Sequence, residues 1–208
     1  LGGLVSSTAV TLGFSQRSRQ AGADASALAF GIMLAWTVMF FRVVIMASII
    51  NGPLGWRLAV AMALLCAVSL GACYWLWRRR RQMARGKVEP GENPFELGEA
   101  VKFGLLFGVV VFVAKAAEVY LGEAGLYLAA AVAGLTDVDA ITLAMADLAK
   151  GDAAQVTVAA RAILIAVIAN TLVKSGMAIS LGSAELRRRA LPISGALLAA
   201  GIVAGFLI

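Results

Sequence analysis

Histidine is absent from this chain of 208 residues, and charged residues make up only 14% of it. The lack of histidine excludes His-based proton relays, His metal sites, and Ser-His or Cys-His nucleophile pairs within the chain. The two cysteines, Cys66 and Cys73, share one apolar segment and form no CxxC pair. We interpret them as small buried hydrophobic residues rather than as a metal site or a disulfide. Because no phosphate-binding glycine motif and no pair of nucleophile and base is evident, we do not expect an enzyme.

Apolar residues dominate the sequence instead. They account for 61% of the chain, and the mean hydropathy of +0.89 lies far outside the range of soluble domains. The composition predicts an integral membrane protein that is surrounded by a lipid bilayer. Its isoelectric point near 9.8 comes from short basic clusters. Since such clusters set orientation in a membrane, they call for no nucleic-acid partner.

Long apolar runs predict the membrane-spanning helices. Residues 25–50 are long enough to cross a hydrocarbon core of about 30 Å, and Asn51-Gly52-Pro53 ends the run. The predicted fold class is all-α, with about five full transmembrane helices plus broken or re-entrant helices. Because the chain begins at Leu1 without Met or a signal peptide, we expect upstream sequence, which would bring the full spans to six. The other four spans are predicted at residues 54–77, 101–120, 155–181 and 190–208.

A polar motif near the start of the chain is repeated in its second half. The segment GLVSSTAVTL, residues 3–12, recurs 131 positions later as GLTDVDAITL. The main difference is that Ser6 and Thr8 are replaced by Asp137 and Asp139. Transporters are often built from internal repeats that meet at broken helices. We therefore expect the two copies of the motif to form one binding centre near the membrane midplane.

The second copy interrupts an apolar segment. Residues 124–135 are apolar, and residues 140–150 resume a helical pattern after a polar break. Thr136 and Asp139 have the spacing of a capping box, which predicts that a helix begins at Thr136. The segment is thus expected to be two short helices, each covering about half a bilayer at about 1.5 Å per residue. They would form either one interrupted span or a re-entrant hairpin.

The basic clusters favour the re-entrant hairpin. It places all three basic loops on the cytoplasmic side, as the positive-inside rule requires. It also gives each half an odd number of spans, so the halves would be related by inverted topology. We divide the chain into a first repeat, truncated at its start, at 1–77, a cytoplasmic basic linker at 78–99 and a second repeat at 100–208. The basic loops are residues 16–20, 78–88 and 185–189.

Asp137 and Asp139 are the main candidates for ion binding. As a helix cap and a first-turn acid they would stabilise the helix by about 1 kcal/mol. As a carboxylate pair they would bind a cation or a proton, because ionisable groups at membrane depth usually lie on a transport path. Together with Thr136, Thr142 and carbonyl oxygens at the helix break, they suit a hard cation such as Mg²⁺ or Na⁺. Both roles are compatible, and no other cofactor is expected.

Hydroxyl groups take the place of these acids in the first copy. Ser6, Ser7, Thr8 and Thr11 either cap a helix and bond within it, or line a polar centre together with the acids.

Asn170 and Lys174 lie one helical turn apart in a predicted span. Lys174 either extends to the cytoplasmic interface or is the counter-charge of Asp137 or Asp139, and its release would couple protonation to substrate binding. Arg42 offers the same counter-charge from the first repeat.

Several segments together resemble a known family. GLVSSTAVT with its sequel QRSRQ, NPFEL before a span, GLTDVDAITL and NTLVKSG are similar to the uncharacterised membrane domain at the C-terminal end of many bacterial MgtC/SapB-like proteins. The resemblance covers nearly the whole chain. It implies a bacterial inner-membrane location and an upstream MgtC-like helical domain. Magnesium homeostasis is connected with that upstream domain and does not transfer to these residues.

The sequence predicts a transporter or channel for a small ion, either a cation such as Mg²⁺ or Na⁺ or a proton-coupled solute. The alternative is a non-transporting regulatory subunit that binds another membrane complex through its lipid-facing surface or its linker. We expect a homodimer or an association with the MgtC-like domain. The predicted ion-binding residues are Ser6, Ser7, Thr8, Thr11, Thr136, Asp137, Asp139, Thr142, Asn170 and Lys174, with Asp137 and Asp139 as metal ligands.

Overall fold

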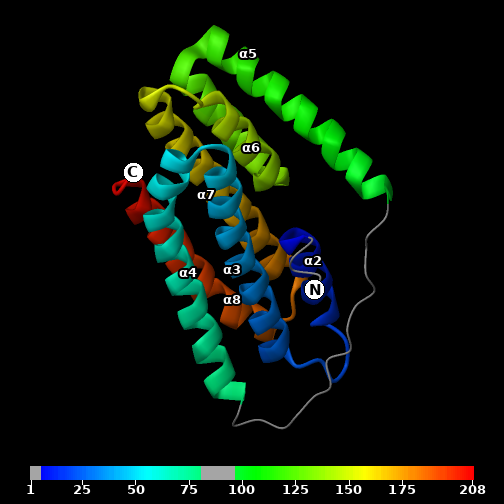
Figure 1. Cartoon of the computed structure of the whole chain (residues 1–208). Coiled ribbons are helices and arrows are strands. Elements are labelled where there is room, and N and C mark those ends of the chain that lie inside the picture. Colours follow the sequence, from blue (N-terminus) through cyan, green and yellow to red (C-terminus); the bar gives the residue numbers. More distant parts are fainter. Residues whose placement is uncertain (1–5, 81–96) are drawn as a thin grey trace. The chain divides into compact units, whose positions relative to one another are not determined.

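The computed structural model describes residues 6–80 and 97–208, and the regular structure in this part of the chain is entirely helical (Figure 1). The all-α prediction is therefore confirmed. Most of the predicted linker at 78–99 lies outside the described residues, as does the start of the first motif. The helices are α2 (Ser7–Arg17), α3 (Ala25–Ile50), α4 (Gly52–Arg80), α5 (Leu97–Thr136), α6 (Val138–Leu148), α7 (Ala153–Leu181) and α8 (Ala184–Gly205).

Four segments of the described chain are long and apolar enough to cross a membrane. They are Ala25–Ile50, Gly52–Arg78, Val119–Thr136 and Ala153–Leu181. Large apolar side chains stay exposed on these helices, as at Phe41, which is 65% exposed. Such a surface is unfavourable in water and suits hydrocarbon. The fold is thus that of a membrane-embedded protein. The predicted spans at 25–50, 54–77 and 155–181 are among these segments, whereas those at 101–120 and 190–208 stay predictions.

Helices α3 and α7 begin in the same way. The side chains of Asp24 and Asp152 each accept a backbone N–H from the first turn of the helix that follows, at 2.9 and 2.8 Å. Shortly before each acid, a glycine has a positive φ, 78° at Gly22 and 80° at Gly151. Glycine adopts this left-handed conformation without steric cost. An Asp cap after a glycine turn therefore sets the start of both long helices.

The predicted break after residue 50 is confirmed. Asn51 separates α3 from α4, and its side-chain oxygen accepts the N–H of Leu54 at 3.2 Å. Pro53 is tolerated because it lies in the first turn of α4, where its missing N–H would have no helical acceptor. The Asn51 amide also donates to the carbonyl O of Ala149 at 3.0 Å. The junction is therefore held both within its own chain segment and against the end of α6.

The interrupted segment differs from the prediction in two ways. Asp137, with extended backbone, is the N-cap of α6, so the expected helix start at Thr136 is wrong by one residue. The helix before the break is also longer than half a bilayer, because Val119–Thr136 forms an apolar segment of 18 residues. Gly122 kinks α5 with a φ of 58°, at the place where the sequence predicted the previous span to end.

Helix α8 begins earlier than predicted. It starts at Ala184 instead of residue 190, so residues 185–189 are helical and the predicted basic loop is wrong. Ser183 explains the early start, because its Oγ accepts the N–H of Leu186 at 3.2 Å and caps the helix.

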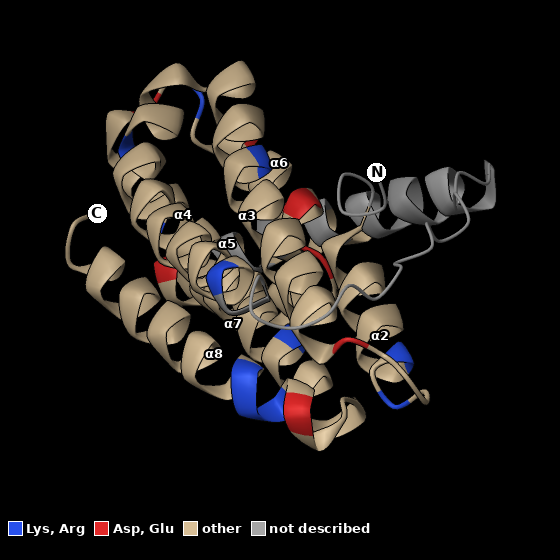
Figure 2. Cartoon of the chain, turned by 90° about the horizontal axis from the view of Figure 1, so that it is seen from below, with Lys and Arg blue, Asp and Glu red and all other residues tan. Residues whose placement is uncertain are grey.

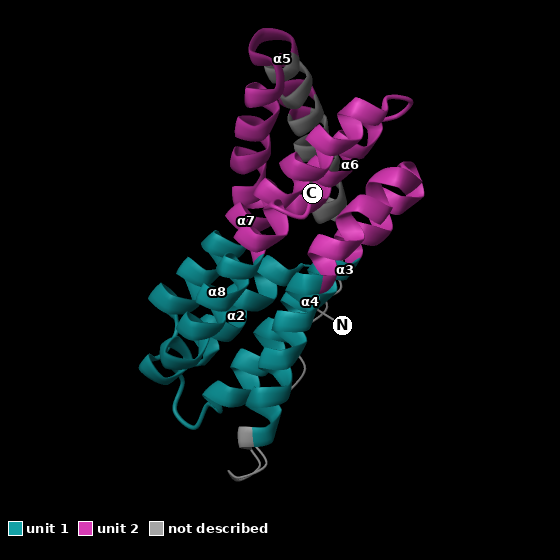
Figure 3. Cartoon of the chain, turned by 90° about the vertical axis from the view of Figure 1, so that its left-hand side faces the viewer, with its two compact units in different colours: residues 1–41, 64–94, 171–200 teal, residues 42–63, 95–170, 201–208 magenta. Residues whose placement is uncertain are grey.

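The described helices form two compact units (Figure 3). Trp36 and Phe40 are fully buried in unit 1, and Leu58 and Met145 are fully buried in unit 2. Helices α3, α4, α7 and α8 contribute residues to both units. Among the described residues, unit 1 comprises 6–41, 64–80 and 171–200, and unit 2 comprises 42–63, 97–170 and 201–208.

Candidate functional site

The two copies of the motif begin two short helices in the same way. Ser6 is the N-cap of α2 and Asp137 is the N-cap of α6, and each side chain accepts a backbone N–H of the first turn. Both helices have 11 residues and end at C-caps that also correspond, Ser18 and Ala149. All these positions are 131 residues apart in the sequence. The sequence repeat is therefore also a repeat of local structure.

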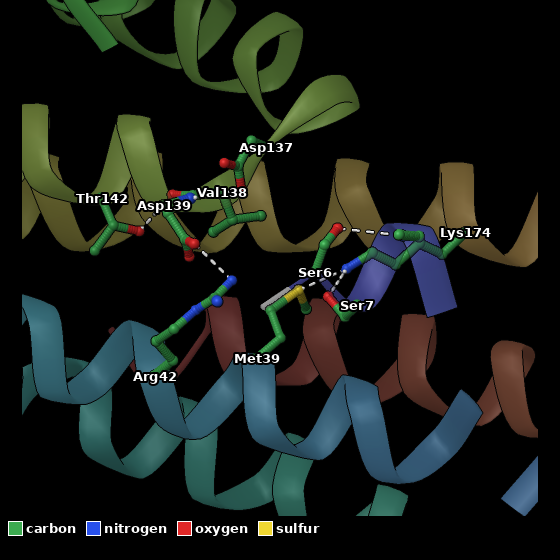
Figure 4. A network of polar contacts seen from close by, with 10 residues as sticks. Ser6, Ser7, Met39, Arg42, Asp137, Val138, Asp139, Thr142 and Lys174 are labelled. Carbon is green, nitrogen blue, oxygen red and sulfur yellow. Dashed lines mark hydrogen bonds and ion pairs between the residues drawn. The ribbon is translucent and has the colours of Figure 1, made fainter. Parts of the chain in front are cut away.

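Lys174 is the most deeply buried charged residue described in unit 1, with only 1% of its surface exposed. Its Nζ donates a hydrogen bond of 2.7 Å to Ser7 Oγ and lies 2.8 Å from Met39 Sδ (Figure 4). This burial disagrees with the alternative in which Lys174 extends to the cytoplasmic interface. Placing an ammonium group inside an apolar helix bundle is costly unless polar groups surround it. The first motif provides such a group through Ser7.

A chain of hydrogen bonds continues from Ser7 into unit 1. Thr11 Oγ1 donates to the carbonyl O of Ser7 at 2.7 Å, and Trp36 Nε1 donates to Thr11 Oγ1 at 2.8 Å. Sequence reasoning missed Trp36 and Met39. A tryptophan in the middle of an apolar span is a usable signal, because its buried N–H needs an acceptor. Met39 offers no comparable signal.

Unit 2 contains an ion pair between α3 and α6. Arg42 Nη2 lies 2.5 Å from Asp139 Oδ2, and the two side chains are 25% and 13% exposed (Figure 4). The prediction that Arg42 offers a counter-charge is confirmed for Asp139. An ion pair with this geometry is a charge-assisted hydrogen bond, which is about twice as strong as a neutral one.

The other polar residues of the second motif have local roles. Asp137 accepts the N–H of Asp139 at 3.1 Å and thereby caps α6. Thr142 is fully buried and donates to the carbonyl O of Val138 at 2.8 Å, the counterpart of the Thr11 bond in α2. Thr136 is exposed and donates to the carbonyl O of Ala133. Of the predicted ligands, Asp137 and Asp139 are joined by this backbone hydrogen bond, whereas Thr136 bonds back into its own helix.

Asn170 holds the end of α5 against α7. Its Nδ2 donates to the carbonyl O of Gly134 at 2.8 Å, and Asn170 is buried. At Gly134 the two helices are so close that an added Cβ would lie 2.4 Å from the carbonyl O of Ala166. Asn170 thus fixes the helix that leads into the break at Asp137.

The first motif lies in unit 1 and the second in unit 2, and their meeting in one centre stays a prediction. Ser7, Thr11 and Lys174 come together in unit 1, while Ser6 caps α2 and Thr8 is half-buried. No group of three or more His, Cys, Asp or Glu residues that could hold a metal occurs in the described part of the chain. A cation at Asp139 would therefore have to compete with Arg42 for the carboxylate.

Comparisons with known proteins place the chain in a family without naming an activity. A family model described as a domain of unknown function, DUF4010, matches residues 1–182. An uncharacterized protein of Aquifex aeolicus (strain VF5) is 36% identical over 188 residues, which cover 90% of this chain and 82% of that protein. No solved structure matches the chain. The chain therefore belongs to the DUF4010 family.

Proposed function

We propose that this chain is a membrane transporter or channel for a small ion, and that its coupling step is the replacement of Arg42 by a cation or a proton at Asp139. The observation that carries the proposal is the Arg42–Asp139 ion pair, 2.5 Å long, between an apolar span and a helix break. Helix α3 is apolar enough to cross a membrane, so an arginine in it has a high energetic cost. Charged groups retained in such helices usually serve transport.

The chemistry of the Arg42–Asp139 pair explains how ion binding could be coupled to a change in conformation. A carboxylate that is paired with a guanidinium resists protonation, because the positive charge favours its ionised form. A proton or Na⁺ that binds Asp139 removes the partner of Arg42 and changes the charge around the helix break. The state of Asp139 would thus be linked to the conformation of α3 and α6.

Two pairs of contacts support the inverted relation of the repeats. In unit 1, Lys174 of the second repeat contacts Ser7 of the first motif. In unit 2, Arg42 of the first repeat contacts Asp139 of the second motif. The basic side chain that contacts each motif therefore belongs to the other repeat. A two-fold axis that relates inverted repeats produces this kind of exchange.

The helix junctions show the same exchange of contacts between the two repeats. The N–H of Ser183, at the start of α8, donates to Ser18 Oγ at the end of α2, at 2.8 Å. Asn51, at the start of α4, donates to the carbonyl O of Ala149 at the end of α6. Both contacts join a junction of one repeat to the short helix of the other. They support the inverted relation of the two repeats.

The remaining elements of the proposal concern the ion and the membrane. The oxygen atoms of Asp137 and Asp139 favour a hard cation such as Na⁺ or Mg²⁺, or a proton that drives a solute. We place the chain in the bacterial inner membrane with its basic ends in the cytoplasm. An upstream MgtC-like domain, a homodimer and a re-entrant arrangement of residues 124–150 are further expectations of the resemblance and of the charge pattern.

Flux measurements in proteoliposomes test the proposal. Asp139→Asn should abolish Na⁺, Mg²⁺ or proton flux, because the neutral amide cannot exchange Arg42 for a cation. Asp147→Asn is the matched control: Asp147 lies on the same helix, is 71% exposed and, among the described residues, pairs only with the neighbouring Lys150. Its flux should equal that of the wild type. Undiminished flux in Asp139→Asn would refute the proposed coupling step.

A folded wild-type protein that moves none of these ions would refute the transport function as a whole. It would favour the regulatory-subunit alternative, which a stoichiometric partner in a pull-down from native membranes would identify.

A further inference from the structure

The three consecutive arginines at the start of α8 have different environments. Arg187 Nε donates to the carbonyl O of Ile179 at 2.9 Å, near the C-terminal end of α7, where a positive charge is favourable. Arg189 is 14% exposed and forms an ion pair of 2.5 Å with Glu185. Arg188 is exposed and makes no hydrogen bond or ion pair with the residues that the structure describes. Its charge is therefore available to a ligand.

Arg188 lines a cavity in unit 1. The cavity has a volume of about 560 Å³ and is bordered by Trp75 of α4 and by Ala184, Glu185, Arg188 and Arg189 of α8. This volume lies within the range of small-molecule sites. The described residues of the lining include two arginines and one glutamate, a net charge of +1. The cavity favours an anion that has an apolar part for the Trp75 ring.

The cavity lies at the end of a predicted membrane span. Trp75 belongs to the aromatic cluster Tyr74, Trp75 and Trp77, which directly precedes Arg78 at the end of the span Gly52–Arg78. Tryptophan and tyrosine gather where lipid headgroups meet the hydrocarbon. Figure 2 shows basic residues at the start of α8, next to an acidic one. The opening is thus placed at the depth of lipid phosphates.

We propose that this cavity binds the headgroup of an anionic phospholipid. Arg188 donates to the phosphate oxygens in the fork geometry that guanidinium groups offer to phosphate. Arg189, held by Glu185, contributes a second positive charge from a fixed position. The Trp75 ring packs against the glycerol and the upper acyl chain. A free phosphate ion would use the arginines but would make no use of the apolar Trp75 ring, so a lipid is the favoured source of the phosphate.

A second cavity shows why the charge of the lining matters. It lies in unit 2, has a volume of about 420 Å³ and is lined by Trp56, Arg57 and Asp152 among others. The described lining contains one arginine and one carboxylate, and Arg57 already donates to the carbonyl O of Ile208 at 3.3 Å. The lining is balanced in charge, so no preference for anionic lipid is expected there. Arg57 thus provides a control in which a similar Trp–Arg cavity loses its arginine.

Native mass spectrometry of the full chain in detergent tests the proposal with phosphatidylglycerol and phosphatidylcholine of the same acyl chains. The wild type should retain phosphatidylglycerol preferentially. Arg188→Gln should weaken that binding about fivefold, the effect of one basic residue at a membrane surface. Arg188→Lys keeps the charge and should lose less. Arg57→Gln should retain the wild-type preference.

Arg78→Gln is the decisive control. Arg78 is exposed at the end of α4 and does not line the cavity, so its removal lowers the general charge of unit 1 by the same amount. A loss equal to that of Arg188→Gln would mean diffuse electrostatic attraction and would overturn the proposal. Equal retention of both lipids by the wild type would overturn it as well. Inorganic phosphate that binds as tightly as phosphatidylglycerol would refute the lipid assignment.

Discussion

The Arg42–Asp139 ion pair should be the most strongly coupled polar contact described in unit 2. Breaking a buried pair by removing one partner typically costs about 3 to 5 kcal/mol, because the other charge stays buried. Here the side chains are 25% and 13% exposed, which allows some solvation of the charge that remains. We therefore expect about 3 kcal/mol for Asp139→Asn, which leaves the guanidinium without its partner. Arg42→Met should cost about 2 kcal/mol, because the carboxyl group can take up a proton.

The double variant Arg42→Met/Asp139→Asn distinguishes pairing from packing. With both charges removed, its loss of stability should be smaller than the sum of the single losses by about 2 kcal/mol. The free energy of unfolding is measured for all four proteins by equilibrium unfolding in mixed micelles of mild detergent and SDS, followed by circular dichroism. Losses that add to within about 0.5 kcal/mol would refute the reasoning, because independent sites behave in this way.

Two further contacts lead to predictions that use the same measurement. Gly134→Ala should lower the free energy of unfolding by about 2 kcal/mol, because its Cβ would lie 2.4 Å from the carbonyl O of Ala166. Gly176→Ala, which meets open space, should leave stability unchanged or raise it by up to about 1 kcal/mol, and an equal loss in both variants would contradict this explanation. Trp36→Phe should cost about 1 to 2 kcal/mol, because it removes the hydrogen bond from Trp36 Nε1 to Thr11 Oγ1. Adding Thr11→Val should cost less in that background than in the wild type, and full additivity would show that the bond is not important.

Local signals were sufficient for most helix boundaries. The apolar run at 25–50 coincides with α3, Ala25–Ile50, because the run is long and strong breakers follow it. The predicted start of α8 was wrong because the arginines at 187–189 were interpreted as part of a loop. Their charge predicts a side of the membrane, whereas the backbone follows the cap at Ser183. Charge patterns and capping patterns thus carry different information, and only the latter locates a helix end.

The sequence was sufficient to select the residues of the candidate site, but not to predict which residues they contact. Thr136 and Asp137 are both good N-cap residues, and the sequence does not decide between them. The contact of Lys174 with Ser7 joins residues 167 positions apart, so no local pattern encodes it. The burial of Lys174 likewise depends on helices packed around it. Arg42 was recognisable as a charge in an apolar span, but its choice of Asp139 is a property of the tertiary fold.

The matched caps of α2 and α6 have a consequence for how the two halves diverged. Ser6 and Asp137 start helices of the same length, so the backbone at this position accepts a neutral or an acidic cap equally well. Capping therefore placed no constraint on the charge of the residue at this one position. At this cap, hydroxyl and carboxylate are interchangeable for the backbone, so the difference between the two copies here is one of electrostatics.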